Sequence, residues 1–270
     1  NTSPIIFQLK KILPYALGPG ILILGTIGGI LMIKDKSLLV IPLAFACYFL
    51  PQTLLFAKWT RFIAPAFPFF VIFAAFFLQK TQNKLLFIIG YFLLTINLVW
   101  SLMFFSIYLQ PDVRITATSW INEKLPVNSF ILTEAGNMLE APLKGDFQKT
   151  PFDFYHLEEN LALQQQLPEF LVQADYFIIQ SRRIFINHQR LPEQFPKTAS
   201  FYDLLFSSQL GFEKIKEFSA FPQFSIFNFQ FSIPDEVEEE TWSVFDHPVI
   251  RIYQKTKPLS EETYEKLLKI

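Results

Sequence analysis

A run of seventeen residues without any charge, 62–78, constrains the fold of this chain more than any other feature. The run is mostly apolar and is interrupted only by Pro65 and Pro68. A helix of this length is just long enough to cross a hydrocarbon core of about 30 Å, because each residue adds about 1.5 Å. The run therefore predicts a membrane-spanning helix.

A basic and aromatic cluster, Lys58, Trp59 and Arg61, stands directly before this run. One interpretation is that Lys58 and Arg61 lie at the mouth of a membrane site and bind an anionic lipid headgroup. The other is that the cluster only anchors the end of the helix, because indole and long basic side chains are stable at the headgroup level. From these residues alone, anchoring is the simpler interpretation, since it needs no ligand.

The charges divide the chain into two parts near Gln110. Residues 1–110 contain eight basic residues and one acid, Asp35, whereas the remainder contains 15 basic and 23 acidic residues. A bilayer enforces such a scarcity of acids, because a carboxylate at its centre costs several kcal/mol. The acidic second part has no basic surface to neutralise phosphates, so the sequence argues against nucleic-acid binding.

The first part contains four apolar segments of spanning length, and we expect a helical membrane region over residues 1–110. Gly18-Pro19-Gly20 would weaken a soluble helix, but a membrane bundle tolerates it where a neighbouring helix covers the freed backbone groups. The connecting loops are short, so neighbouring helices must be antiparallel. The basic residues are almost equally shared between the two sides and do not decide the orientation. The expected spans are 12–33, 38–57, 62–78 and 85–109.

In residues 111–270 the spacing of the apolar residues changes, and short apolar strands alternate with helices. This pattern predicts a small soluble α/β domain with a partly parallel sheet. Residues 219–243 form a long excursion rich in Phe and then in acids. Glu238-Glu239-Glu240 within it is most simply a solvated surface. The expected strands are 129–133, 176–180, 212–218 and 249–254, and the expected helices are 113–125, 157–173, 198–208 and 260–269.

Two groups of polar residues follow the ends of predicted strands, where open parallel sheets place their sites. They are Glu134 with Asn137, and Ser181 with Arg182 and Arg183, of which Arg183 is best explained by a solvated turn. A solvated turn is the simpler alternative for each group.

Other polar residues indicate no further chemistry. Adjacent side chains form a relay only at a sharp turn, so a structural turn is the more economical interpretation of Asp246-His247. His156 and His188 lack partners at ligand spacing, and we assign no metal site and no cofactor. The sole cysteine, Cys47, excludes a disulfide within the chain.

Several stretches together resemble a known family. Lys58-Trp59-Thr60-Arg61-Phe62, followed by Pro65 and Pro68, resembles the luminal helix start of GT-C integral-membrane glycosyltransferases, in the branch of protein O-mannosyltransferases and the bacterial aminoarabinose transferase. Later blocks resemble the extracytoplasmic C-terminal domain of bacterial and archaeal members. These blocks are ATSWINEKLP (117–126), 129–134, ADYFIIQSRR (174–183), 190–196, YDLLFSSQLGF (202–212) and EETWSVFDHP (239–248).

The resemblance implies a cell-membrane enzyme that moves a sugar from a polyprenyl-phosphate carrier to an acceptor at the outer face. Lys58 and Arg61 would contact the lipid phosphate, and the C-terminal domain would be extracytoplasmic. The family's catalytic acid lies in an early loop that has no counterpart here, so we expect the C-terminal portion of such an enzyme, which needs its N-terminal part as a partner.

Two other classes of function remain open. The chain is alternatively a non-enzymatic membrane-anchored module whose α/β domain captures a ligand at the sheet edge, or a scaffolding component. A closed pocket at Glu134 and Ser181, without a cavity among the helices, favours the binding module. The transferase predicts a positive cavity at the outer face that Lys58 and Arg61 line.

Overall fold

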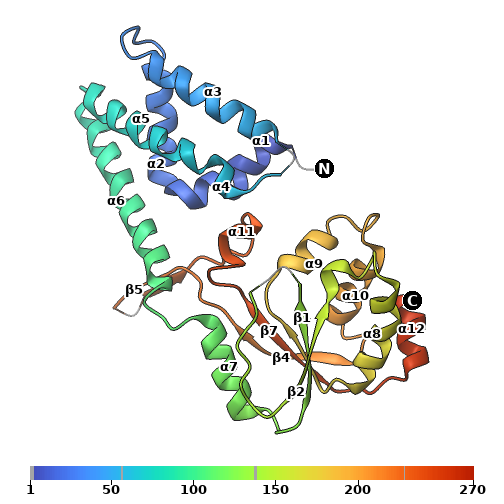
Figure 1. Ribbon diagram of the computed structural model, residues 1–270. Helices are drawn as coiled ribbons and strands as arrows, with labels where there is room; N and C mark the ends of the chain where they lie inside the picture. The colour runs from blue at the N-terminus through green and yellow to red at the C-terminus, as the bar shows by residue number, and fades with distance from the viewer. Residues whose placement is uncertain (1–2, 56, 137–138, 228) are drawn as a thin grey trace. The chain divides into compact units, whose positions relative to one another are not determined.

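A computed structural model of the chain describes residues 3–55, 57–136, 139–227 and 229–270 (Figure 1). The chain forms two compact units. The helical unit comprises residues 1–109 and 221–242, and the α/β unit comprises 110–220 and 243–270. The sequence analysis placed residues 221–242 in the outer domain, but their contacts lie within the helical unit.

The helical unit contains three stretches long and apolar enough to cross a membrane, Pro4–Met32, Thr60–Lys80 and Lys84–Ile107. The first combines α1 (Pro4–Phe7), a π-helical turn (Gln8–Ile12) and α2 (Leu13–Met32). The second combines α4 (Thr60–Ile63), a 3-10 turn (Ala64–Ala66) and α5 (Phe67–Lys80). The third is α6 (Lys84–Ile107), whose side-chain cap is Asn83.

The segment expected as a fourth span, 38–57, is shorter in the structure. Its helix α3 (Val40–Leu54) has 15 residues, and the backbone is extended at Leu55 with ψ 144°. At about 1.5 Å per residue such a helix is shorter than a hydrocarbon core of about 30 Å. Three long apolar helices are therefore described, instead of the four spans that the sequence predicted.

The Gly-Pro-Gly run produces a kink within α2. Gly18 has φ 74°, a left-handed conformation that breaks the helical ladder, and Pro19 lacks an N–H donor. Two side chains of α6 cover the break: Asn97 Oδ1 accepts from the Ile21 N–H at 3.0 Å, and Trp100 Nε1 donates to the Tyr15 carbonyl at 3.2 Å. The expected rescue by a neighbouring helix is confirmed.

Glycine also permits the close approach of α2 to α5. A Cβ added at Gly28 would lie 1.8 Å from the Phe73 carbonyl oxygen, and one at Gly25 would lie 2.6 Å from the Phe70 carbonyl oxygen. Helices that meet without a hydrophobic driving force gain their stability from such backbone proximity. Among the described residues of the helical unit, α2 and α5 make the most extensive contact between helices.

The α/β unit is built on a five-stranded mixed sheet of order β2-β1-β3-β7-β4. Strand β1 is parallel to β2 and β3, whereas β7 is antiparallel to β3 and β4. The strands are β1 (Phe130–Ala135), β2 (Gln148–Asp153), β3 (Tyr176–Ile179), β4 (Phe212–Phe218) and β7 (Ile250–Lys255). The sequence missed β2, which is polar and contains Pro151, a residue tolerated in an edge strand.

Helices cover both faces of this sheet (Figure 1). Helices α8 (Leu161–Gln173), α10 (Pro196–Phe206) and α12 (Glu261–Leu268) pack on one face, and α7 (Val113–Lys124) lies along the other. Short helix α9 (Arg183–His188) follows β3. The larger core includes Leu132, Phe177, Leu167, Phe201, Tyr202 and Tyr264, each 0 % exposed. An α/β sheet region after the apolar helices is thus confirmed.

The described residues of the excursion expected over 219–243 include a hairpin and a short helix. Strands β5 (Gln223–Ile226) and β6 (Phe229–Ser232) pair antiparallel, and α11 (Glu240–Ser243) follows. The Gln223 N–H donates to Ser106 Oγ of α6 at 3.0 Å. The ring of Trp242 meets Phe104 of α6 edge-on at 5.5 Å. This segment is therefore tied to the last turns of α6.

Candidate functional site

An apolar groove lies among α2, α3 and α5 of the helical unit. Its volume is about 320 Å³, and its lining is almost entirely hydrocarbon. Thr26 and Gly29 of α2 face Ala46 and Phe49 of α3 across it, and Phe73 of α5 lies along its side. Small residues on two facing helices leave this space, which long apolar side chains would otherwise fill.

The groove extends between two ends, one lined by Leu9 and Leu13 and the other by Ile33, which precedes Lys34. Leu9 and Leu13 flank Lys10 and Lys11 in the sequence. Phe45 and Phe49 of the groove wall pack in one cluster with Phe7. Lys58 places its Nζ 5.8 Å from the centre of the Phe7 ring. Half-buried Lys58 therefore lies beside a ring that packs on the same buried cluster as the groove wall, but neither Lys58 nor Arg61 is among the described residues that line the groove.

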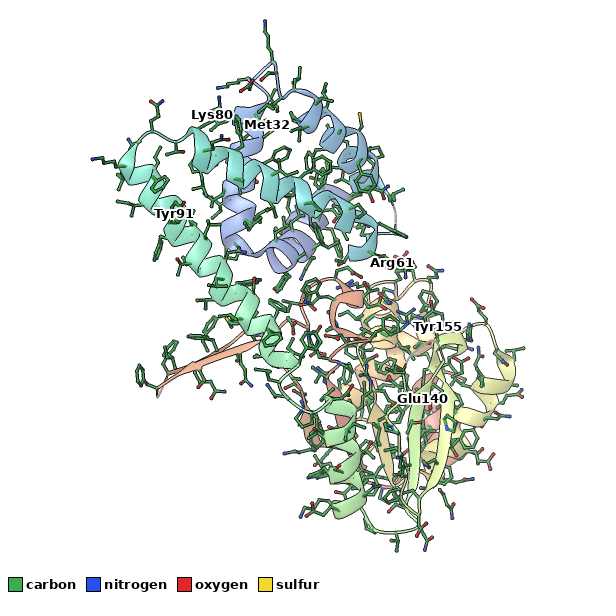
Figure 2. The ribbon with its side chains drawn as sticks, turned by 60° about the vertical axis from the view of Figure 1, so that its left-hand side comes forward. Met32, Arg61, Lys80, Tyr91, Glu140 and Tyr155 are labelled. Atoms are coloured by element: carbon green, nitrogen blue, oxygen red, sulfur yellow. The ribbon has the colours of Figure 1, made fainter. Side chains whose placement is uncertain are left out.

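Arg61, the second residue assigned to lipid phosphate, is exposed and stacks on its neighbours. Its Cζ lies 4.0 Å from the centre of the Trp59 ring and 5.4 Å from that of Phe62 (Figure 2). Stacking engages the face of a guanidinium, whereas its N–H donors point outward in its plane. This geometry suits an interfacial anchor and also orients the donors for an anionic group.

A buried carboxylate binds the residue between these two cations. Glu239 is 2 % exposed, and its Oε2 accepts from the N–H of Thr60 at 3.0 Å and from its hydroxyl at 2.8 Å. The Glu239 N–H donates to the Lys11 carbonyl at 3.2 Å, and Lys11 Nζ donates to the Val237 carbonyl. Glu239 thereby caps the N-terminus of α4, where a negative charge is stabilising.

This contact overturns the expectation that residues 238–240 form a solvated surface, because Glu238 and Glu239 are 1 % and 2 % exposed. The cap has a chemical consequence. Since Glu239 already occupies the backbone and hydroxyl donors of Thr60, an anion at this end would be held by the side chains of Lys58 and Arg61.

The second candidate site is the edge of the sheet where β1 and β3 end. Glu134 is 0 % exposed there, and its carboxylate accepts from the hydroxyl of Tyr202 and from the Gln180 N–H at 2.9 Å. The Gln180 side chain donates back to the Glu134 carbonyl at 2.8 Å and accepts from the Ala141 N–H. The network ties the loop after β1 to the end of β3.

Burial dominates the electrostatics of this carboxyl group. It raises the pKa of Glu134 from 4.5 to about 7, against the opposing effect of hydrogen bonds from Tyr202, Gln180 and Ser181. Burial and the Glu134 charge raise the pKa of Tyr202 well above its ordinary value. A group with a pKa near 7 is suited to proton transfer, but full burial keeps Glu134 from any solute unless the edge opens.

The other residues predicted at this edge are engaged within the protein. Ser181 is 2 % exposed, and its hydroxyl accepts from the Arg183 N–H at 3.3 Å. Arg182 is 3 % exposed and donates from Nη2 to Ser243 Oγ at 3.1 Å. Asn137 lies outside the described residues. The structure thus brings Glu134 and Ser181 together, whereas Arg182 contacts a different segment.

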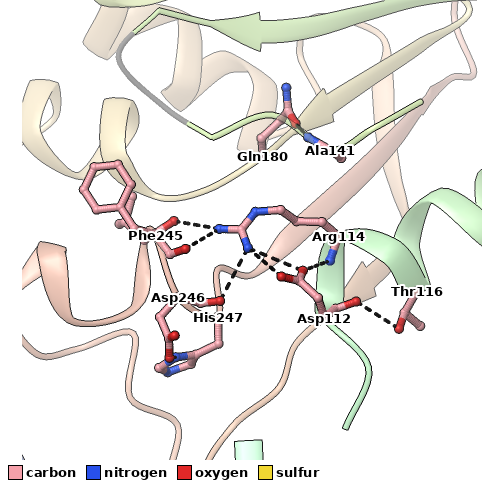
Figure 3. A network of polar contacts seen from close by, with 9 residues as sticks. Asp112, Arg114, Thr116, Ala141, Gln180, Phe245, Asp246 and His247 are labelled. Atoms are coloured by element: carbon pink, nitrogen blue, oxygen red, sulfur yellow. Dashed lines mark hydrogen bonds and ion pairs between the residues drawn. The ribbon is translucent and has the colours of Figure 1, made fainter. Parts of the chain in front are cut away.

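Sequence reasoning missed a third set of residues, centred on Arg114 of α7 (Figure 3). Arg114 is 5 % exposed, pairs with Asp112 at 3.1 Å and donates to the Phe245 carbonyl at 2.8 Å. His247 Nδ1 lies 2.8 Å from Asp246 Oδ2. The turn before β7 that the sequence favoured at these positions is present, and the acid–imidazole contact also forms within it, where Arg114 donates to the carbonyls of Phe245 and Asp246.

The comparisons with known proteins give no assignment. No protein-family model matches the chain, and neither a curated protein nor a solved structure is significantly similar to it. Among the described residues, no group of three or more His, Cys, Asp or Glu side chains is arranged to bind a metal ion.

Proposed function

We propose that this chain is the C-terminal part of a GT-C type membrane glycosyltransferase, which moves a sugar from a polyprenyl-phosphate carrier to an acceptor at the outer membrane face. The observation that carries the proposal is the apolar groove of about 320 Å³, whose wall packs on the same buried cluster as Phe7, the ring beside Lys58. The family resemblance of the Lys58–Phe62 stretch points to the same ligand.

The chemistry of the groove suits an isoprenoid phosphate. An isoprenoid chain is uncharged and branched, and it gains about 25 cal/mol for each Å² of apolar surface that it buries. The phosphate at its end needs cations, and Lys58 and Arg61 supply two. In a transfer reaction the carrier phosphate departs with its negative charge, and two fixed cations stabilise that charge in the transition state.

The α/β unit would lie outside the cytoplasm and cover the lipid-sugar site or help to place the acceptor. The catalytic acid would come from the N-terminal part of the enzyme. On this proposal the Glu134 network is a rigid element of the outer domain, since its side chains are buried and bonded to each other.

A binding measurement on the purified chain in detergent tests the carrier site. Native mass spectrometry would compare a 55-carbon polyprenyl phosphate with the corresponding polyprenol. We expect the phosphate to bind at least about tenfold more tightly, because two cation–phosphate contacts contribute well over 1 kcal/mol when partly shielded from water. The double variant Lys58→Gln/Arg61→Gln should bind both lipids equally.

Control variants distinguish binding at this site from a nonspecific attraction of the phosphate to basic residues. Lys34→Gln/Lys36→Gln removes two cations from a different loop and should leave binding unchanged. Ala46→Phe fills the groove and should weaken both lipids, whereas Ala44→Phe, on the exposed face of the same helix, should not. Equal binding of polyprenol and polyprenyl phosphate to the unmodified chain would reject the carrier site.

The rival function, a membrane-anchored binding module, is less well supported. Its distinguishing feature is a pocket at Glu134 and Ser181 without a cavity among the helices. A cavity lies among the helices, and the side chains of Glu134 and Ser181 are 0 % and 2 % exposed and are hydrogen-bonded within the protein.

A further inference from the structure

The hairpin formed by β5 and β6 exposes an apolar face that nothing in the helical unit covers. The side chains of Phe229, Phe231 and Ile226 are 63 %, 50 % and 49 % exposed. An isolated two-stranded hairpin is only marginally stable in water, and such a face adds to the cost. This face would therefore be more stable in an apolar environment than in water.

Strand register divides the hairpin into two chemically distinct faces. Phe224 pairs with Phe231 and Ile226 pairs with Phe229, so apolar side chains lie opposite one another. The alternate pairs, Gln223 with Ser232 and Ser225 with Gln230, are polar. No charged residue occurs between Phe218 and Asp235. An amphipathic element of this kind is suited to lie flat between hydrocarbon and water.

The residue at the tip of the hairpin is aromatic, although its backbone conformation is unfavourable for a bulky side chain. Phe227 has φ 51°, in the left-handed region, and its side chain is 99 % exposed. Two-residue hairpin turns with positive φ favour Asn, Asp or Gly, because a bulky side chain is strained there. Strain combined with complete exposure indicates that the ring is needed for an external contact.

The hairpin continues a surface that is itself suited to lipid. It is hydrogen-bonded to Ser106 in the last turn of α6. Only 6 % of an 18-residue apolar stretch of α6 is buried within the protein. Phe105, Tyr108 and Leu109, at the same end, are 56 %, 66 % and 71 % exposed. Figure 2 shows the hairpin projecting from this end of α6 with its side chains standing clear of the helices.

We propose that strands β5 and β6, with Phe227, form a membrane-interface anchor, which lies in the plane of the lipid surface at the end of α6 with Phe224, Ile226, Phe229 and Phe231 in the acyl region. The tip ring of Phe227 enters the same layer. The anchor would fix the level at which α6 leaves the membrane. It rests only on the membrane-spanning part of the proposed function, not on the transferase activity.

A fluorescence measurement tests the anchor in the whole chain. Cys47→Ser would remove the native thiol, and single cysteines would be introduced by Phe229→Cys, Phe227→Cys or Ser232→Cys and labelled with a polarity-sensitive dye. The protein would be placed in phosphatidylcholine–phosphatidylglycerol nanodiscs, with nitroxide groups on lipids near the headgroup in one sample and deep in the acyl chains in a second, which reaches position 92. We expect blue-shifted emission and strong quenching at positions 227 and 229, and weaker quenching at 232 on the polar face.

Two reference positions make the outcome decisive. Phe92→Cys on α6, 63 % exposed, reports the lipid-facing helix, and Leu161→Cys at the start of α8, 72 % exposed, reports a solvent-facing surface. If the dye at 92 is quenched but those at 227 and 229 resemble the dye at 161, the anchor is refuted while the spanning helices stand. An unquenched dye at 92 refutes the spanning helices.

Two further results would also overturn the proposal. Blue-shifted emission at 227 and 229 without quenching would show that protein, such as a second copy of the chain, covers the hairpin. Equal quenching at 229 and 232 would exclude a hairpin lying flat at the surface. Two labelled apolar positions keep the test valid if one variant does not fold.

Discussion

Asn97 of α6 accepts a hydrogen bond from the backbone N–H of Ile21 across the break in α2, at a distance of 3.0 Å. The residues are far apart in sequence, and together they satisfy a donor that the kink at Gly18 releases. In an apolar surrounding an unsatisfied N–H costs several kcal/mol, so the kink and the amide depend on each other.

Replacing Asn97 by Leu should lower the free energy of unfolding by about 1–3 kcal/mol, because the Ile21 N–H loses its acceptor. Thermal unfolding in detergent, followed by circular dichroism, measures the loss. Thr95→Ala serves as the control, since Thr95 lies on the exposed face of the same helix and bonds only within it. Equal effects of the two substitutions would show that the kink needs no support from α6.

The contact of α2 with α5 predicts a graded effect of adding one methyl group. Gly28→Ala should destabilise by about 1–3 kcal/mol, because its Cβ meets the Phe73 backbone carbonyl and the helices must separate. Gly29→Ala should cost less, because the nearest atom to its Cβ, 3.1 Å away, belongs to the side chain of Phe73. The order of the two apparent melting temperatures is the measurement, and the reverse order would contradict the packing.

Glu134 predicts a dependence of stability on pH with a definite sign. Its folded pKa, about 7, exceeds the ordinary 4.5, so between these values the folded state binds more protons than the unfolded state. Stability attributable to this group therefore falls as pH rises from about 4.5 to 7, by up to about 3 kcal/mol. Glu134→Gln should remove that fall, as measured by denaturant unfolding at several pH values.

His188 changes stability in the opposite direction, so the comparison must be made between variant and parent. Burial lowers the pKa of His188 to about 4, and its stabilising effect is lost as pH falls from about 6.5 toward 4. Both variant and parent contain this residue, and its effect cancels in the difference. A difference that does not vary between pH 4.5 and 7 would show that Glu134 does not titrate in this range.

The cap on α4 predicts local loosening when the carboxylate is removed. Glu239→Ala leaves the N–H and hydroxyl of Thr60 without this acceptor and should release residues 221–242 from α4. Faster proteolysis within 233–239 is the expected result, with a loss of about 1–2 kcal/mol. Glu123→Ala, at a side chain that is 69 % exposed, is the control. Unchanged cleavage would mean that the segment is held by other contacts, such as Trp242 on Phe104.

Much of the fold follows from the sequence, because the two units obey different local patterns. Long uncharged runs predict α5 and α6, and short apolar runs predict β1, β3 and β7. What failed depends on distant partners or on weak local signals. Strand β2 lies at the edge of the sheet, where most of its residues are exposed. Its sequence therefore has no apolar pattern. Helix α3 ends early because the chain turns to an extended conformation before Lys58.

The candidate sites were predicted less completely for the same physical reason. From the sequence alone, Glu239 is expected to be a surface acid. In the structure it binds Thr60, which lies 179 residues earlier in the chain. From the sequence alone, Arg114 is one of several basic residues that flank the apolar segments. In the structure it donates to the carbonyls of Val244, Phe245 and Asp246. Lys58 and Arg61 were identified from their sequence context, whereas the apolar groove among α2, α3 and α5 is evident only in the structure.

Photo-crosslinking with a polyprenyl phosphate tests the central claim most directly. The lipid would carry a diazirine within its isoprenoid chain and would be added to the purified chain in nanodiscs, with the labelled peptides identified by mass spectrometry. We predict labels on the groove residues of α2 and α3, around Thr26 and Ala46, and their loss in Lys58→Gln/Arg61→Gln. Labels confined to the exposed face of α6, and unchanged in that variant, would contradict the account.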